Sequence, residues 1–218
     1  MFCVVVAAPA WMPLGLLIAG VIKIVSPGPV FFKQERVGYL GRRFGCLKFR
    51  TMAVDADTSV HRGHLENLMK SNGPMTKLDK TGDSRLIPGG LFLRTLGLDE
   101  LPQLLNVLMG EMSLVGPRPC LPYEYEKYSL RHRERCRTLP GLTGLWQTSG
   151  KNRTTFEEMI DLDLHYAKHK SLFMDLKIIS MTIPAVLAQA RDVSRAGKEP
   201  LRSSVRSLRA RRIVDQQS

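Results

Sequence analysis

Two adjacent carboxylates open the segment of this 218-residue chain that has the clearest chemical content. Asp99 and Glu100 precede an apolar run with the spacing of a helix, and Arg118 follows in a Pro-Arg-Pro corner. Neighbouring carboxylates repel each other, so such a pair suits a position where a cation or an electrophilic phosphate offsets the charge. Arginine is the side chain whose shape best grips a phosphate, through two parallel hydrogen bonds. The segment therefore indicates phosphoryl chemistry.

Each of these residues also has a purely structural explanation. Asp99 and Glu100 suit the positive end of a helix that starts there, and Pro102 suits its first turn. The local sequence by itself favours this explanation for the two acids. The functional alternative gives one carboxylate the attack on phosphorus and the other a Mg²⁺ ion, and the spacing does not say which is which. For Arg118, a solvated side chain and a phosphate ligand both remain open.

Histidine and cysteine patterns predict neither a transition-metal site nor a disulfide framework. His165 and His169 stand four residues apart, a spacing that can bind metal, but no HExxH motif or third ligand accompanies them. We therefore expect surface or packing histidines, as for His61 and His64. The four cysteines are far apart and form no CxxC pair, which fits a reducing, cytosolic environment.

The charge balance favours polyanionic partners. The chain has 32 Lys and Arg against 20 Asp and Glu, a net charge of +12. Nucleic acid, an anionic lipid surface and phosphorylated substrates all suit this excess. No recognisable nucleic-acid-binding module is present, and the apolar N-terminus argues against that partner.

The N-terminal segment predicts membrane association. Residues 1–22 carry no charged side chain, and as a straight helix they would measure roughly 33 Å, enough to cross a hydrocarbon layer of ~30 Å. Pro9 and Pro13 interrupt the segment, and a bend at Pro13 would leave arms of roughly 18 and 14 Å, each too short to span. A re-entrant helix fits as well as a spanning one, and a buried core helix is the alternative. The basic residues that follow, up to Arg50, mark the cytoplasmic side.

Periodicity predicts a β-hairpin and several helices in the rest of the chain. The hairpin comprises Val30–Phe32 and Phe44–Phe49 around a turn at Gly38 to Gly41. The segment 71–83 reads as a polar loop. In the last helix a broad apolar surface belongs either to the core or to a helix lying on lipid. Helices are expected at 59–70, 90–97, 100–109, 123–137, 155–168 and 172–190.

Several ordered motifs between about Pro13 and Ala190 resemble the bacterial sugar transferases. These are the monotopic polyprenol-phosphate phosphoglycosyl transferases that initiate exopolysaccharide and glycan assembly. The matching segments begin with the SPGPVFFKQERVG run at 26–38 and include those that contain the Asp99-Glu100 pair and the Pro-Arg-Pro corner. The full set is 26–38, 48–52, 98–108, 112–119, 140–147, 149–158 and 175–177.

The resemblance implies an α+β fold, mostly helical with a small β-hairpin, on an N-terminal re-entrant membrane helix. The expected organisation is a membrane helix at 1–25, a catalytic domain at 26–190 and a basic tail at 191–218, which is either disordered or in contact with anionic lipid. Met1 falls inside the first arm of the expected anchor, so either the anchor is shortened at its start or the start of the chain is displaced. The expected location is the cytoplasmic face of the bacterial inner membrane, in contact with its lipids.

The resemblance also implies a reaction. Asp99 would attack the β-phosphorus of a UDP-sugar, a hexose derivative by the motif at 149–158, and release UMP. Polyprenyl (undecaprenyl) phosphate would then take the sugar phosphate from the aspartyl carboxylate. Glu100 would coordinate Mg²⁺. The expected substrate-binding residues are Lys48, Arg94, Arg118 and Asp175.

Two questions stay open at this point. A non-catalytic basic protein, bound peripherally to the membrane or serving as a scaffold, is the competing hypothesis. The oligomeric state is also undetermined, with a homodimer among the alternatives.

Overall fold

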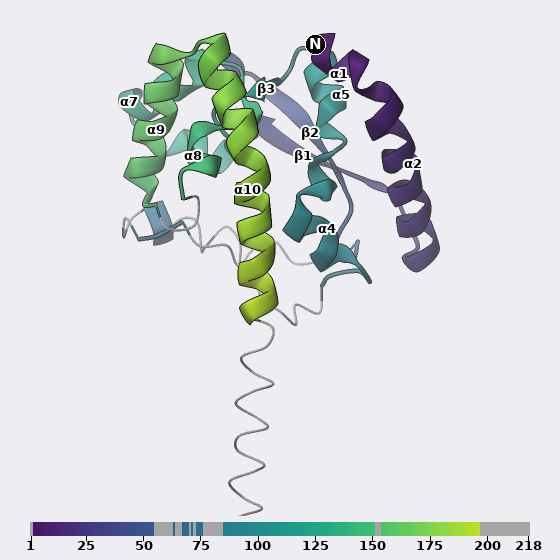
Figure 1. The fold of residues 1–218 in the computed structure, drawn as a ribbon. Helices are drawn as coiled ribbons and strands as arrows, with labels where there is room; N and C mark the ends of the chain where they lie inside the picture. The colour runs from purple at the N-terminus through teal and green to yellow at the C-terminus, as the bar shows by residue number, and fades with distance from the viewer. Residues whose placement is uncertain are drawn as a thin grey trace, which may run out of the picture.

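The fold is helix-rich, with two small two-stranded sheets in the part that the structure describes (Figure 1). The structure is a computed structural model that describes residues 2–54, 63, 67–69, 71, 73–75, 85–150 and 154–196. This arrangement confirms the mixed, mostly helical fold. The helical elements are α1 (Phe2–Val6), α2 (Ala8–Val25), η1 (Tyr39–Gly41), α4 (Gly90–Leu96), η2 (Leu98–Glu100), α5 (Gln103–Leu108), α6 (Pro122–Glu126), α7 (Leu130–Arg133), η3 (Glu134–Arg137), α8 (Leu145–Thr148), α9 (Phe156–His169) and α10 (Leu172–Ala196).

The N-terminal helix α2 is apolar and largely exposed. It has 18 residues and a mean hydropathy of 1.8, and 11% of them are buried. Among the described residues it is the helix whose length and composition would allow it to cross a membrane. Its buried side chains, Ile18 and Ile22, pack against Phe49 and Ile87.

The interruption predicted at Pro13 is wrong. The α2 helix runs through Pro13, and the interruption lies at Ala7, between α1 and α2. Pro9 sits in the first turn, where a backbone N–H has no helical acceptor to lose. Pro13 removes one hydrogen bond, to the carbonyl of Pro9, and the helix continues beyond it.

The predicted hairpin is confirmed and is longer than expected. Its strands are β1 (Phe31–Val37) and β2 (Arg43–Phe49), paired antiparallel with Gln34 opposite Cys46 and Phe32 opposite Lys48. Directly opposite residues in an antiparallel pair share a face, and so do residues two apart along a strand. Arg36, Cys46 and Lys48 therefore lie on one face of the hairpin.

A second sheet joins two motifs that the sequence pattern leaves unpaired. Strand β3 (Ser113–Val115) pairs in parallel with β4 (Gly141–Thr143). Glycines let the two backbones approach closely, because an added Cβ on Gly116 would overlap the Leu139 carbonyl oxygen. This pairing brings the chain just before the Pro-Arg-Pro corner against the chain that follows Pro140.

Replacing Gly141 by Ala should destabilise the protein by about 3 kcal/mol or more, because the new methyl group meets backbone that cannot move aside. An added Cβ there would overlap the Gly116 nitrogen and the Thr143 carbonyl oxygen. Chemical denaturation in detergent measures the loss. Gly20→Ala is the matched control, because nothing lies within 4 Å of its added Cβ. Equal stability of the two variants would contradict the close approach.

The helix predicted at 123–137 is wrong as a single element. The chain forms α6, α7 and η3 instead, with a break before Leu130. The Ser129 hydroxyl accepts a hydrogen bond from the His132 backbone N–H and starts a new helix there. The other helices begin and end close to their predicted bounds, and α10 continues to Ala196. The predictions for 59–70 and 71–83 lie wholly or largely outside the described residues. The tail predicted at 191–218 starts too early, because residues 191–196 belong to α10; the rest of it lies outside the described residues.

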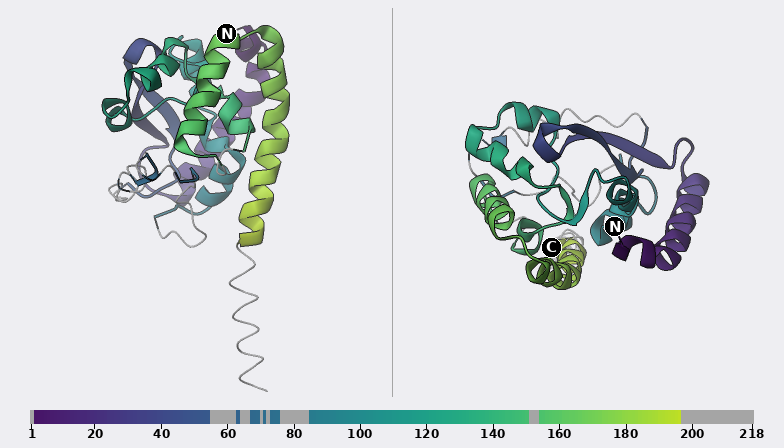
Figure 2. Two further views of the ribbon diagram at one scale, coloured as in Figure 1. Left: turned by 90° about the vertical axis from the view of Figure 1, so that its left-hand side faces the viewer. Right: turned by 90° about the horizontal axis from the view of Figure 1, so that it is seen from above.

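The central elements connect the hairpin to the last helix. The views in Figure 2 place α10 and the hairpin on opposite sides of the molecule, with α4 and α5 between them. Asn106, fully buried in α5, accepts a hydrogen bond from Leu47 N (3.0 Å) and donates one to Gly45 O (2.9 Å). This side chain fixes β2 against the helix that follows the two adjacent carboxylates.

Candidate active site

Asp99 and Glu100 lie on a short 3₁₀ turn of their own, η2, rather than inside the first turn of α5. Gly97, with φ of +68°, ends α4 in the left-handed conformation and redirects the chain into this turn. The flanking residues Leu98 and Leu101 pack against the apolar cluster beneath α2. The Asp99 residue is 9% exposed, whereas the Glu100 side chain is 37% exposed. The two neighbouring acids therefore have different environments.

Lys48 and Glu100 meet at this turn although they are 52 residues apart in sequence. The Lys48 ammonium donates a hydrogen bond to Glu100 Oε1 at 2.9 Å, and this pair is partly shielded from solvent. Lys48 reaches the turn because Asn106 holds β2 against α5. The structure thus brings together two of the predicted site residues.

Further charges surround the buried thiol of Cys46, on the same face of the hairpin. Burial raises the pKa of this thiol, while the nearby cations Lys48 and Arg36 act in the opposite direction. Glu100 and Arg118 also act electrostatically on it, so the charged groups of both motifs lie around one region. A buried, protonated thiol is a poor nucleophile. Cys46 therefore does not compete with the carboxylates for that role.

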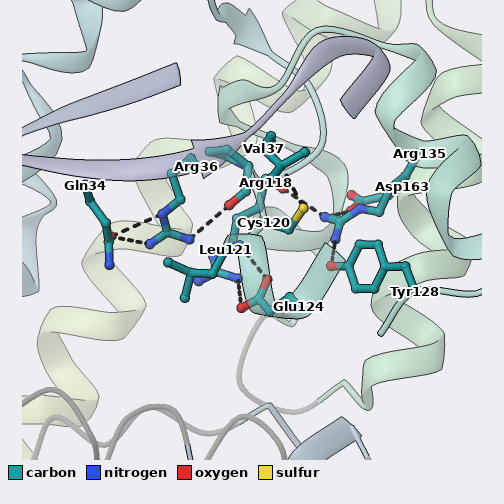
Figure 3. A network of polar contacts seen from close by, with 11 residues as sticks. Gln34, Arg36, Val37, Arg118, Cys120, Leu121, Glu124, Tyr128, Arg135 and Asp163 are labelled. Carbon is teal, nitrogen blue, oxygen red and sulfur yellow. Dashed lines mark hydrogen bonds and ion pairs between the residues drawn. The ribbon is translucent and has the colours of Figure 1, made fainter. Parts of the chain in front are cut away.

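Arg118 lies in the corner between β3 and α6, with its side chain 24% exposed. Its guanidinium NH1 is 3.7 Å from Glu124 Oε1 (Figure 3). The other oxygen of Glu124 accepts a hydrogen bond from the Leu121 backbone N–H at 3.1 Å. Glu124 therefore holds the start of α6 and stands beside the Arg118 guanidinium.

Two buried arginines contact the backbone of the same corner. Arg36 donates to the Pro119 carbonyl at 3.0 Å, and Arg135 donates to the Arg118 carbonyl at 3.0 Å (Figure 3). Arg135 also forms a buried ion pair with Asp163. The sequence pattern identifies neither arginine as a site residue. Arg36 ends a run of four polar residues, Lys33–Arg36, and Arg135 lies in a run of basic residues, so a buried position has no local signal at either.

Asp175 lies on α10 and Arg94 on α4, two helices that contact each other. The Tyr166 hydroxyl shares its hydrogen between Asp175 Oδ1 (2.8 Å) and the Val115 carbonyl oxygen (3.1 Å). Asp175 thereby ties the start of α10 to α9 and to β3, the strand that leads into the Arg118 corner. Arg94 lies in the last turn of α4, directly before Gly97 and the η2 turn.

Replacing Tyr166 by Phe should lower the free energy of unfolding by about 1–2 kcal/mol, because two acceptors lose their donor. Burial and the hydrogen bond to Asp175 raise the pKa of Tyr166. A raised folded-state pKa means that the stabilisation is complete below about pH 10 and declines as the pH rises further. Denaturation at neutral and alkaline pH tests both points. Tyr39→Phe, at an exposed tyrosine, should change nothing, and an equal loss there would contradict the assignment.

His165 and His169 are exposed on α9, as expected for surface histidines. The His165 and His169 rings lie 4.4 Å apart on α9, and no cluster of three or more His, Cys, Asp or Glu that could hold a metal is found within the described ranges. His61 and His64 lie outside those ranges.

Comparison with known proteins decides the family. A family model for the bacterial sugar transferases matches residues 1–189. The chain belongs to the bacterial sugar transferase family. Its relatives are named as transferases and exopolysaccharide production proteins, and by family this sugar transferase is an enzyme. The segments 26–38, 98–108 and 112–119 that carry the sequence resemblance all lie inside the matched range.

Three relatives illustrate the extent of the match. The exopolysaccharide production protein ExoY of Sinorhizobium fredii is 42% identical over 182 residues, which cover 84% of this chain and 80% of that protein. The galactosyl transferase CpsE of Streptococcus agalactiae is 44% identical over 80% of this chain and 40% of its own length. The UDP-glucose:undecaprenyl-phosphate glucose-1-phosphate transferase of Caulobacter vibrioides is 42% identical, over 80% of this chain and 63% of its own length. The sugar transferase thus corresponds to most of ExoY and to a part of the longer relatives.

Proposed function

We propose that this sugar transferase moves a hexose-1-phosphate from a UDP-sugar to polyprenyl (undecaprenyl) phosphate through a covalent intermediate on Asp99. The observation that carries the proposal is the turn at Asp99 and Glu100, where a largely buried carboxylate adjoins a second one paired with Lys48. The relative named UDP-glucose:undecaprenyl-phosphate glucose-1-phosphate transferase supports this choice of donor and acceptor.

The proposed reaction has two displacements at one phosphorus. In the first, an Asp99 carboxylate oxygen forms a bond to the β-phosphorus, and the bond from that phosphorus to the bridging oxygen breaks, so that UMP leaves with the oxygen. In the second, an oxygen of the lipid phosphate attacks the same phosphorus. The bond to Asp99 then breaks, which regenerates the carboxylate and yields a polyprenyl diphosphate sugar. Splitting one transfer into two steps lets two dissimilar substrates use one nucleophile.

The cations around the turn suit the charge of a diphosphate. Lys48 is at the turn itself, and Arg118 presents a planar guanidinium that matches phosphate oxygens. Such groups stabilise the charge that develops on the transferring phosphoryl group. We assign substrate binding to both residues and keep the same assignment for Arg94 and Asp175, on the charged positions that the family resemblance implies.

The two acids also fit a Mg²⁺ ion that arrives with the donor. Magnesium is commonly held by one or two carboxylates together with substrate phosphates, and it does not need a cage made only of protein ligands. Glu100 is the half-exposed member of the pair and would bind the ion, which when present neutralises diphosphate charge. Asp99, the buried member of the pair, would then be the one that attacks phosphorus.

The exposed apolar surface of α2 supports a membrane location for the reaction. Val21 and Ile24 are among its exposed side chains, and a contiguous exposed apolar surface is typical of a contact with lipid or protein. We assign residues 1–25 to a re-entrant anchor in the bacterial inner membrane, with the catalytic domain at 26–190 on the cytoplasmic face. There a lipid phosphate reaches the site at head-group height.

Purified protein in detergent, given undecaprenyl phosphate, Mg²⁺ and a panel of UDP-hexoses, tests the proposal. We expect UMP release and transfer of label to the lipid with one of the UDP-hexoses, glucose and galactose first among them. Absence of UMP release with every donor would contradict the proposed reaction and favour the non-catalytic alternative.

A further inference from the structure

We infer that Arg36 and the Arg135–Asp163 pair are positioning residues, which hold the backbone of the Pro-Arg-Pro corner so that the Arg118 guanidinium faces the diphosphate of the donor. The inference rests on the proposed function, because it gives Arg118 a phosphate to bind. Figure 3 shows the network that carries it.

Arg36 makes its hydrogen bonds to neutral oxygens. Its NH1 donates to the Pro119 carbonyl at 3.0 Å, and its Nε and NH2 both donate to Gln34 Oε1, at 3.1 and 2.6 Å. The residue is 7% exposed. A buried charge without a hydrogen-bonded carboxylate adds little to stability, and an apolar residue could fill the same space. What the guanidinium does provide is a fixed point for the Pro119 carbonyl.

Arg135 holds the preceding carbonyl from the other side of the corner. It is 1% exposed, and its charge is balanced by a buried ion pair with Asp163. Its NH1 donates to the Tyr128 hydroxyl at 2.8 Å, and its NH2 donates to the Arg118 carbonyl at 3.0 Å. Two consecutive carbonyls, of Arg118 and Pro119, are thus bound by arginines from β1 and from η3.

The two prolines complete the restraint on the corner. Pro117 and Pro119 each have a fixed φ angle, so the backbone around Arg118 has few remaining rotations. With both neighbouring carbonyls bound, the direction in which the Arg118 side chain leaves the backbone is set before any substrate arrives. Preorganised donors of this kind cost no rearrangement when charge develops.

The Arg118 side chain itself remains able to bind. Within the described part of the chain its guanidinium makes no hydrogen bond, and its ionic contact is to Glu124 Oε1 at 3.7 Å. That oxygen has no hydrogen-bond partner among the described residues, whereas Oε2 of the same carboxylate is bound by Leu121 N. Glu124 therefore attracts the guanidinium without occupying its N–H groups. These groups can point to a phosphate.

A double-mutant cycle between Arg36 and Arg118 tests the inference. Arg118→Met and Arg36→Met should each raise the KM for the UDP-sugar, by about 10- to 100-fold for charge-assisted hydrogen bonds lost or misdirected. The double variant should be no worse than Arg118→Met, because Arg36 then has no guanidinium to position. Arg36→Lys, which can still donate to one carbonyl, should recover part of the loss. Binding of UDP measured by calorimetry should follow the same order.

Arg43→Met is the matched control. Arg43 belongs to the partner strand of the same hairpin, has a side chain that is 57% exposed, and pairs at 3.3 Å with the equally exposed Glu35. Its removal should leave the KM within about twofold, as expected for an exposed ion pair. If Arg36 had a merely structural role, Arg36→Met would lower stability and activity by the same factor in the wild-type enzyme and in the Arg118→Met variant. Such additive effects would overturn the inference.

The Arg135–Asp163 pair provides an independent test of the inference if Arg36→Met does not fold. The variant Arg135→Met with Asp163→Leu replaces a buried ion pair by apolar residues, a change that proteins can tolerate. We expect the same rise in KM and the same lack of additivity with Arg118→Met. If the wild-type enzyme turns over and Arg118→Met matches it, or if both cycles are additive, the positioning role is wrong and the proposed reaction stands. Failure of the wild-type enzyme to release UMP would instead contradict the proposed function.

Discussion

Replacing Asp99 by Asn should abolish both UMP release and covalent labelling by UDP-sugar. The amide is similar in size to the carboxylate, so the η2 turn can keep its packing around Leu98 and Leu101. The amide lacks the anionic oxygen that forms the bond to phosphorus, and we expect a loss of at least ~10³-fold in kcat.

Mass spectrometry of protein quenched after exposure to donor alone measures this result most directly. The wild-type enzyme should carry one sugar phosphate and the Asp99→Asn variant none. Asp161→Asn is the control, because its carboxylate is exposed on α9 and pairs with the exposed Arg131; that variant should be labelled like the wild-type enzyme. Full turnover by Asp99→Asn would show that another group is the nucleophile. Confirmed turnover of the wild-type enzyme without any adduct would remove the two-step mechanism.

Replacing Glu100 by Gln should lower activity by about 100-fold and raise the Mg²⁺ concentration needed for half-maximal rate. The amide is a weaker ligand for a hard cation than a carboxylate, and it also loses the charge that pairs with Lys48 at 2.9 Å. UMP release measured over a Mg²⁺ titration gives both quantities from one experiment.

Lys48→Met separates the two effects of Glu100→Gln, which are the loss of a metal ligand and the loss of the ion pair with Lys48. It breaks the same ion pair but keeps the Glu100 carboxylate. Its activity should fall because a cation for the diphosphate is lost, while its Mg²⁺ requirement should not rise, because the carboxylate no longer shares its charge with an ammonium group. An unchanged Mg²⁺ titration in Glu100→Gln would rule out the assignment of the metal to this residue.

The sequence by itself determined those features that depend only on residues close to each other along the chain. The hairpin follows from two apolar runs around a turn at Gly38 to Gly41, and α9 and α10 follow from helical spacing. The adjacent acids at positions 99 and 100 are visible as a motif. The family resemblance likewise depends on short ordered motifs, and the family match over residues 1–189 confirms it.

Only the tertiary structure decided how these segments meet. Lys48 reaches Glu100, 52 residues away in sequence, because Asn106 holds β2 against α5. A pattern of neighbouring residues cannot predict a contact between segments so far apart. At Ser129 the side-chain cap of a new helix prevails over the helical spacing of 123–137. At Pro13 the helix continues although proline removes one backbone hydrogen bond. The contacts of Arg36 and Arg135 with one corner arise because burial removes water and leaves the two backbone carbonyls as partners for their charged donors. Burial is a property of the whole fold, and for that reason these two arginines cannot be told from solvated ones in the sequence.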